Sequence, residues 1–204
     1  VDANGNGDYT NIQDAIDNAT AGDYIRVWAG TYNEDVEIDK TLKLVGNGTS
    51  TIINGYSSES GIAAVTINAN WVNFSYFNIK DGNSSYAGLK LSSANSEIKN
   101  ITISGIAAHG MILENADYNS ILNCTIKDNT NDGIEIVDGS NNNLFYQNII
   151  KSNKDGIHIA GDNNRINNNT ITDNRYGIII YATHHNLVAN NTIVGDAIGL
   201  MLQA

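Results

Sequence analysis

The sequence that decides the fold is Gly133-Ile-Glu-Ile136, which recurs as Gly156-Ile-His-Ile159 and as Gly177-Ile-Ile-Ile180. Each copy reads glycine, apolar, any residue, apolar, and the copies follow one another at intervals of about 22 residues. The same pattern extends to both sides, in Gly88-Leu-Lys-Leu91, Gly110-Met-Ile-Leu113 and Gly199-Leu-Met-Leu202. Repeats of this length are typical of solenoids, because so short a unit must stack on its neighbours to bury its apolar residues.

The side chains within each copy alternate with a period of two, which predicts short strands rather than helices. Ile134 and Ile136 then point to one side of the strand, and Glu135 and Val137 to the other. Asparagine-bearing turns and further short strands, such as Asn100-Ile-Thr-Ile103, complete each unit. In-register stacking places equivalent residues about 4.8 Å apart, so isoleucines line up inside and turn asparagines can hydrogen-bond along the stack. The pattern therefore predicts an all-β parallel solenoid.

The composition agrees with one solenoid domain and excludes several classes of function. The chain has 204 residues and no proline, which fits coils that donate backbone N–H groups to the coil beside them. With 22 acidic against 11 basic residues and a net charge of −11, it lacks the basic clusters that bind nucleic acids. No apolar run approaches the roughly 20 residues that span a bilayer. The single cysteine, Cys124, excludes a disulfide framework.

The N-terminal third departs from the regular repeat. Thr10–Gln13 reads as a capping box, and apolar residues follow at helical spacing. We therefore expect a short helix over about residues 11–19 that covers the N-terminal end of the core. The single domain 1–204 then divides into a cap (1–23), irregular coils (24–87) and regular repeats (88–204), with the last coil incomplete. In the irregular part we expect a turn at 29–34 and strands at 24–28, 36–38, 41–45, 51–53, 65–67 and 71–79.

Three motifs carry a resemblance to a known family. They are Asp8-Tyr-Thr-Asn-Ile-Gln-Asp-Ala-Ile16, Gly30-Thr-Tyr-Asn-Glu-Asp-Val-Glu-Ile38 and the Gly-Ile-x-Ile repeats with their Asn-x-Ile partners. Together they resemble right-handed parallel β-helix proteins of the pectin-lyase-like superfamily, and above all extracellular domains of the carbohydrate-binding or sugar-hydrolysis type, common in archaeal surface proteins. The resemblance covers nearly the whole chain and implies a single-stranded right-handed β-helix. It leaves function open, because this fold hosts lyases, hydrolases, epimerases, adhesins and structural proteins.

One acidic cluster is the candidate catalytic site. The resemblance implies a site outside one parallel sheet, on side chains stacked from adjacent coils. Stacking makes Glu135 and His158 neighbours in one outward row, and Asp132 and Asp155 neighbours in the row before the glycines. Carboxylates about 5 Å apart repel, which raises one pKa and prepares a general acid–base pair. The same carboxylates could instead bind Ca²⁺, or be ordinary residues of turns and a solvated sheet face.

Other signatures of the family's enzymes are missing from the sequence. We find no counterpart of the pectinesterase Gln-Asp and Asp-Phe motifs, and the Asp-Pro-His-Asp motif of alginate-type epimerases is impossible without proline. The adjacent His184 and His185 diverge on an extended chain, and the four histidines are joined by no methionine or cysteine cluster. We therefore expect no metal site and no cofactor, with calcium as the one alternative.

Exposed aromatic rings are the candidate glycan-binding residues, because rings stack on sugar faces. We expect Phe74 and Phe77 to pack in the core, and we expect a different set of aromatic residues to be exposed. That set is Trp71, Tyr76, Tyr176 and Tyr181.

Sequons of the form Asn-x-Ser/Thr are numerous and supply candidate glycosylation sites. Sequons at Asn123 and Asn190 occupy similar places in their coils, which favours a structural reason for those two. A polar, lysine-poor solenoid rich in Asn, Thr and Gly is typical of a surface protein, so we expect an extracellular or cell-surface location. The candidate sites are Asn18, Asn47, Asn73, Asn83, Asn100 and Asn168.

The last coil begins at Gly199, and no amphipathic cap follows it in the sequence. Repeat proteins usually cap both ends, so we expect self-association or a continuation of the chain to cover this coil. The apolar surface expected there comprises Ile179, Ile198, Met201 and Leu202.

The residues favour a non-catalytic extracellular module as the leading hypothesis. Such a module would be a structural or filament-forming element, or a glycan-binding spacer. The alternative is a polysaccharide-active lyase, hydrolase or epimerase that uses the acidic cluster. An extracellular glycan is a candidate partner, whereas no nucleic acid and no membrane span are expected.

Overall fold

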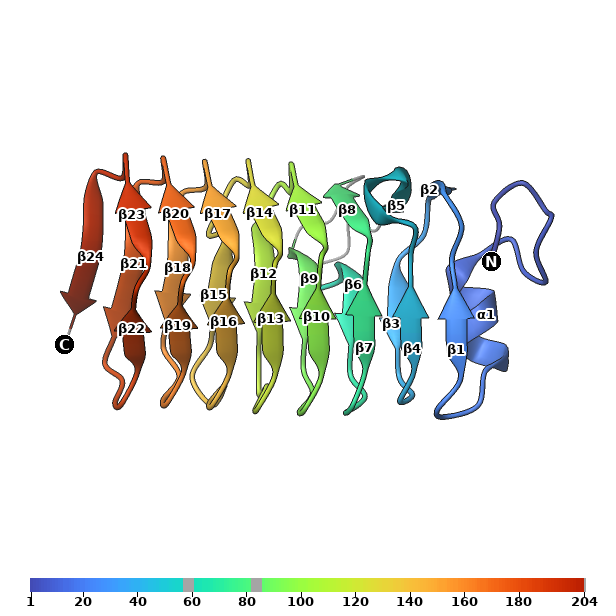
Figure 1. Ribbon diagram of the computed structural model, residues 1–204, viewed down its shortest axis with the longest axis horizontal. Helices are drawn as coiled ribbons and strands as arrows, with labels where there is room; N and C mark the ends of the chain where they lie inside the picture. The colour runs from blue at the N-terminus through green and yellow to red at the C-terminus, as the bar shows by residue number, and fades with distance from the viewer. Residues whose placement is uncertain (57–60, 82–85, 204) are drawn as a thin grey trace.

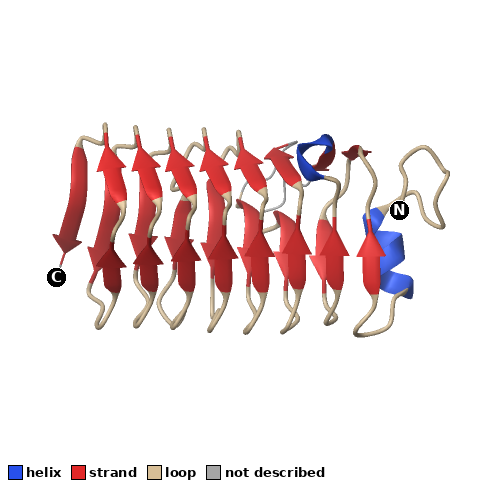
Figure 2. Ribbon diagram, viewed as in Figure 1, coloured by secondary structure: helices blue, strands red, loops and turns tan. Residues whose placement is uncertain are grey.

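The computed structural model describes residues 1–56, 61–81 and 86–203, and it is a right-handed parallel β-helix (Figure 1). Each coil has about 23 residues and passes through three short strands joined by corners. The coils stack along one axis, with the N-terminal helix at one end and β24 (Ile198–Gln203) at the other. Figure 2 shows strands along the walls and loops at the corners. The predicted fold is therefore confirmed.

Three sheets form the walls, and in the described part of the chain each has eight parallel strands. Sheet A comprises β1 (Tyr24–Arg26), β4 (Lys43–Val45), β7 (Asn73–Ser75), β10 (Glu97–Lys99), β13 (Ser120–Leu122), β16 (Leu144–Tyr146), β19 (Arg165–Asn167) and β22 (Leu187–Ala189). Sheet B comprises β2 (Gly30–Tyr32), β5 (Thr51–Gly55), β8 (Asn78–Asp81), β11 (Thr102–Ser104), β14 (Thr125–Lys127), β17 (Ile149–Lys151), β20 (Thr170–Thr172) and β23 (Thr192–Val194). Sheet C comprises β3 (Val36–Ile38), β6 (Ala63–Ile67), β9 (Ala87–Leu91), β12 (His109–Leu113), β15 (Ile134–Ile136), β18 (Asp155–Ile159), β21 (Tyr176–Tyr181) and β24.

The register of sheet C is the one that the repeat predicts. Ile134 pairs with Ile157, and Ile157 pairs with Ile178, so isoleucines form a column inside the solenoid. Glu135 pairs with His158 in the neighbouring outward column. Burying one such isoleucine contributes about 1.5–3 kcal/mol, and a one-residue slip would expose the whole inner column. The apolar column therefore specifies the register.

The corners of the solenoid turn on residues with a left-handed backbone. Asparagine adopts this conformation more readily than most non-glycine residues, which accounts for its excess in the chain. At the corner between sheets A and B these residues have φ between 53° and 66°, and they are Tyr76, Asn100, Asn123, Gln147, Asn168 and Asn190.

Buried asparagines form hydrogen-bonded ladders along the corners. The backbone N–H of Asn119 donates to Oδ1 of Asn143 (2.9 Å), and that of Asn143 donates to Oδ1 of Asn164 (2.9 Å). The side-chain amide of Asn143 also donates to the Ala116 carbonyl (2.8 Å). These contacts satisfy backbone groups that burial would otherwise leave without partners. Two further ladders of the same kind run through Asn148, Asn169 and Asn191, and through Asn129, Asn153 and Asn174.

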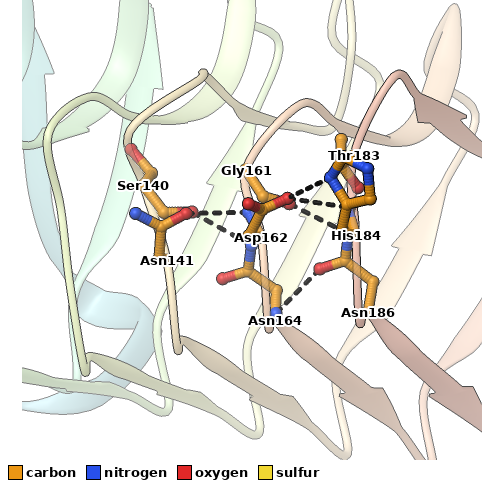
Figure 3. A network of polar contacts seen from close by, with 8 residues as sticks. All are labelled: Ser140, Asn141, Gly161, Asp162, Asn164, Thr183, His184 and Asn186. Atoms are coloured by element: carbon orange, nitrogen blue, oxygen red, sulfur yellow. Dashed lines mark hydrogen bonds and ion pairs between the residues drawn. The ribbon is translucent and has the colours of Figure 1, made fainter.

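A second line of contacts follows the outside of one corner (Figure 3). Oδ1 of Asn141 accepts a hydrogen bond from the backbone N–H of Asp162 (2.8 Å). The Asp162 carboxylate in turn accepts from the backbone N–H of His184 (2.6 Å). The polar residues of this corner are therefore engaged in joining coils.

Helices are a minor part of the described chain. They are α1 (Ile12–Asn18) and the 3₁₀ turn η1 (Gly48–Ser50). The apolar face of α1 is buried against the first coil, as the sequence predicts. Among the described residues no helix has the length and apolar character needed to cross a bilayer.

The N-terminus of α1 differs from the prediction. Asn11, not Thr10, is the N-cap, and within the described residues its side chain makes no capping hydrogen bond. Glu34 supplies the cap, because its carboxylate accepts from the first two helical N–H groups, at 2.8 and 2.9 Å. The capping-box prediction at Thr10–Gln13 is therefore wrong. A carboxylate from the next coil satisfies both donors and also interacts favourably with the helix dipole.

Two predicted elements of the irregular coils also differ. The segment 29–34, expected as a turn, contains β2, which pairs with β5. The segment 71–79, expected as one strand, is divided into β7 and β8 by the left-handed backbone of Tyr76. Phe74 and Phe77 flank this bend and are buried, with stacked rings whose centroids lie 4.6 Å apart. The stacked pair stabilises the bend from inside.

Candidate functional site

The outer face of sheet C carries the candidate catalytic residues at the predicted positions. Glu135 of β15 pairs with His158 of β18 in the outward column. Asp132 and Asp155 occupy the column just before the repeat glycines, and Asp155 begins β18. The parallel stacking of β15 on β18 brings the four residues onto one face. Their role in catalysis stays a prediction.

A fifth residue, His109 at the start of β12, belongs to the same group. Its Nδ1 lies 3.5 Å from a carboxylate oxygen of Asp132 and 3.5 Å from one of Glu135. One ligand atom from each of the three residues lies within 4.8 Å of the others. Sequence reasoning did not single out His109. Its position in the repeat could have indicated it. His109 directly precedes Gly110, just as Asp132 directly precedes Gly133 in the next coil.

The two aspartates of the group are buried. Asp132 is 5% exposed and Asp155 is 7% exposed, and Oδ1 of each has no hydrogen-bond partner among the described residues. Burial raises the pKa of Asp155 above its usual range, and the nearby Asp132 carboxyl raises it further, against the opposing charges of Lys154 and Arg175. A carboxyl in this setting keeps its proton at a pH at which an exposed carboxyl has lost it.

Apolar and charged side chains enclose the group on one side. Ile112 is buried although it lies in the outward column, where it packs with two alanines of β6 and β9 and with Tyr86. Lys90 is paired with Glu114 (2.6 Å) and lies 5.5 Å from the centre of the Tyr86 ring. This lysine is thus engaged with a carboxylate outside the acidic group.

The arrangement is suited to two kinds of chemistry. Asp155, a buried carboxyl with a raised pKa, and the neighbouring Asp132 can serve as a general acid–base pair. Carboxylate oxygens together with an imidazole nitrogen can also ligate a metal ion. Oxygen-only coordination of Ca²⁺ would use the three carboxylates and leave His109 aside.

The four candidate glycan-binding aromatics do not gather on one surface. Trp71 and Tyr76 are exposed at the two corners that flank β7 of sheet A. Tyr176 and Tyr181 lie at the two ends of β21 in sheet C, and only Tyr181 is well exposed. One sugar chain on a single face could not stack on all four rings. A shallow hollow on sheet A, which sequence reasoning did not single out, is lined by Tyr118, Leu144, Tyr146 and Arg165.

The apolar surface expected at the last coil is formed mainly by β24. Ile198 is 44% exposed and Leu202 is 72% exposed, whereas Met201 is half-buried. Ile179 lies between His158 and Met201 in the outward column and is 8% exposed. Ile179 therefore contributes little to a surface that another molecule could contact.

The candidate glycosylation sites differ in accessibility. Asn18, Asn47 and Asn168 are exposed, and Asn73 and Asn100 are half-buried. Asn83 lies outside the described residues. Asn100 and Asn168 have the left-handed backbone shared by Asn123 and Asn190 at the same corner. Corner geometry alone thus accounts for the asparagine in these four sequons.

Comparison of the sequence with known proteins gives one family and one curated relative. A family model described as a right handed beta helix region matches residues 42–193. A cell surface glycoprotein of Methanothermus fervidus is 31% identical over 167 residues. The aligned part is 79% of this chain and 28% of that protein, so the chain spans less than a third of the relative's length.

Comparison of the structure gives proteins that act on polysaccharides. The catalytic domain of a GH87 α-1,3-glucanase, solved with nigerose, has a TM-score of 0.73 and 19% identity, over 89% of this chain and 37% of that chain. An alginate lyase from Paenibacillus has a TM-score of 0.59 and 13% identity, over 95% of both chains. At these identities the similarity shows the fold alone.

Proposed function

The chain belongs to the right-handed β-helix family, and we propose that it is a rigid, non-catalytic module of a cell-surface protein. The observation that carries the proposal is its 31% identity to a cell surface glycoprotein over 79% of the chain. Because the chain aligns with 28% of that relative, the proposal concerns this module and leaves the relative's other parts aside.

The internal construction of the solenoid supports a structural role. Each coil is joined to the next by three parallel strand pairs, and from Asn119 onward also by buried asparagine ladders at the corners. Such contacts repeat from coil to coil, so rigidity extends along the stack. A stiff rod of this kind suits a surface protein that must hold other parts at a distance from the cell.

The scattered aromatic residues support a structural module over a dedicated glycan binder. A sugar-binding platform needs several rings on one face, whereas Trp71 lies at a corner beside sheet A and Tyr181 at the end of β21 in sheet C. Exposed asparagines such as Asn18 and Asn47 are available for glycosylation if the chain is secreted. Glycans would in that case be attached to the module rather than bound by it.

Surface labelling of cells tests the proposed location. An antibody against the recombinant 204-residue chain is applied to intact and to permeabilised cells of the organism that encodes it. We expect equal staining of both, because a surface module is accessible without permeabilisation. Staining that requires permeabilisation would overturn the proposal, and a cytoplasmic marker protein serves as the control for intact cells.

A second candidate function is polysaccharide cleavage, and the acidic group on sheet C is the observation that favours it. Asp155 is buried with a raised pKa beside Asp132, as a general acid would be. The structural relatives are, by name, an α-1,3-glucanase and an alginate lyase. If this chain acts on a polysaccharide, we place the reaction at Asp132, Glu135, Asp155 and His158.

Turnover assays decide between the two functions. The purified chain is incubated with α-1,3-glucan, alginate and pectin, and new reducing ends and unsaturated products are measured. The structural proposal expects no turnover. Cleavage that is abolished by Asp155→Asn and retained by Asp138→Asn, an exposed aspartate of the turn after β15, would establish the enzyme instead. Cleavage that survives Asp155→Asn would place the activity elsewhere.

A further inference from the structure

We propose that His109, Asp132 and Glu135 form a binding site for one divalent transition-metal ion of the zinc or cobalt type. The proposal departs from the sequence expectation of no metal site. It also stands apart from the proposed function, because a surface module and an enzyme could both use such an ion. It rests on the spacing, the burial and the chemistry of the three side chains.

The distances from His109 to the two carboxylates fit metal ligands and are longer than a hydrogen bond. His109 Nδ1 lies 3.5 Å from an oxygen of Asp132 and 3.5 Å from an oxygen of Glu135. A charge-assisted N–H···O bond is shorter, at about 2.7–2.9 Å. Two ligands at about 2.0–2.1 Å from a tetrahedral zinc ion are themselves about 3.4 Å apart. Both separations from His109 fit that value, and the three ligand atoms all lie within 4.8 Å of one another.

Two polar atoms of the site are buried without hydrogen-bond partners. Within the described chain, Nδ1 of His109 and Oδ1 of Asp132 accept or donate no hydrogen bond, and Asp132 is 5% exposed. A buried carboxylate without a compensating charge or hydrogen bond destabilises the fold. The neighbouring Asp155 carboxyl is also buried, and within the described residues its Oδ1 has no hydrogen-bond partner. A bound cation would neutralise the Asp132 and Glu135 carboxylates and give Nδ1 of His109 a partner.

The ligand types select the class of metal. Ca²⁺ and Mg²⁺ prefer oxygen ligands alone, whereas an imidazole nitrogen with carboxylate oxygens suits Zn²⁺, Co²⁺ or Ni²⁺. The only cysteine is distant in the core, so thiolate-seeking ions are not favoured. Three protein ligands leave one tetrahedral position for solvent or another ligand, as in zinc sites of the open kind.

The three side chains come from elements that fix their position. His109 begins β12 and Glu135 is the middle residue of β15, and these strands are paired in sheet C. Asp132 directly precedes Gly133, whose N–H donates to the Asp155 carbonyl (2.8 Å). A site built on paired strands is held more rigidly than one on loops, so metal binding should require little rearrangement.

Metal titration of the whole chain tests the proposal. The protein is treated with EDTA, dialysed, and titrated with ZnCl₂ by calorimetry and with CoCl₂ by visible absorption. We expect one equivalent to bind, tetrahedral Co²⁺ bands, and a higher melting temperature with zinc. CaCl₂ should not compete at equal concentration. Absence of binding, or binding that calcium displaces at equal concentration, would overturn the proposal.

Matched variants locate the ion. His109→Gln and Glu135→Gln should each weaken zinc binding by more than about 100-fold, beyond what loss of an outer-shell partner causes. His184→Gln is the control, because His184 also faces a carboxylate, at 3.7 Å from Asp162, but is 77% exposed. Unchanged affinity in both site variants, or an equal loss in His184→Gln, would refute the site. Glu135 is half-exposed, so its variant decides the question even if His109→Gln folds poorly.

Discussion

At the scale of single residues, the glycine that leads a repeat has no room for a side chain, because the backbone of the next coil lies against it. A Cβ added to Gly133 would lie 2.7 Å from the carbonyl oxygen of Gly156 and 2.7 Å from Cγ2 of Ile150. Contacts this short do not occur for real Cβ atoms, and neither neighbour can move without disturbing a strand. The glycine is therefore required by packing between coils, not by its backbone conformation.

Alanine at Gly133 should destabilise the solenoid by about 1–3 kcal/mol, the usual effect of overpacking. Gly199 is the matched control, because it occupies the same repeat position in the last coil, where an added Cβ meets only Cγ2 of Ile193, at 3.5 Å. Urea unfolding followed by circular dichroism measures both variants. Gly199→Ala should change stability by less than about 0.5 kcal/mol. Equal effects in the two variants would contradict the packing explanation.

Cys124 is a second residue whose surroundings predict its behaviour. The thiol is buried, which raises the pKa of Cys124 to about 12. Because the reactive form is the thiolate, the native protein should not react with a thiol reagent at pH 8, four units below that pKa. One equivalent should react after unfolding in guanidinium, since the chain has one cysteine. Stoichiometric labelling of the native protein would show that the corner opens readily.

At the scale of elements, the strands and their register could be predicted from the sequence because both depend on a local repeat. The pairing of Glu135 with His158 follows from the interval between Gly133 and Gly156. The helix cap could not be predicted in this way. Glu34 comes from a loop 22 residues away, and nothing in the local pattern indicates that its carboxylate reaches Ile12.

In the candidate site, too, the features that follow the repeat could be predicted from the sequence, and the others could not. Stacking predicts which residues share a column, so Asp132 and Asp155 could be placed together before the structure was known. The direction of the His109 side chain toward Asp132 depends on its rotamer and on the side chains around it. Those contacts are tertiary, and no repeat interval encodes them.

The asparagine ladder is the element that most directly joins coils, and Asn143 tests it. Replacement by alanine removes the acceptor for the Asn119 N–H and the donor to the Ala116 carbonyl, both buried. Two unsatisfied groups predict a loss of about 3 kcal/mol or more in the free energy of unfolding. Chemical unfolding measures it, with Asn142→Gly as the control, because Asn142 is exposed and has a positive φ that glycine tolerates. If the free energy of unfolding falls no more than in the control, water satisfies the two groups that Asn143 leaves without partners.

At the scale of the whole molecule, the two ends of the rod differ. Helix α1 covers the first coil, with Ile12 and Ile16 fully buried. At the other end β24 is the last strand of sheet C in the described chain, and Leu200 and Leu202 are 48% and 72% exposed. Apolar side chains beside a free sheet edge favour association. Since α1 blocks the first coil, two copies of this chain can best join through their last coils.

We therefore predict that the 204-residue chain forms a dimer through β24 as its concentration rises, because a contact between two identical surfaces closes at two copies. Light scattering over a concentration series should show the molar mass doubling for the native chain. Leu200→Glu with Leu202→Glu should keep it monomeric, because charges would then be buried at the contact. Ile149→Glu, which alters a residue of sheet B that is 43% exposed and lies away from β24, should dimerise like the native chain. A monomer at every concentration would show that the exposed leucines are insufficient, and masses rising beyond the dimer would point instead to end-to-side contacts that do not close.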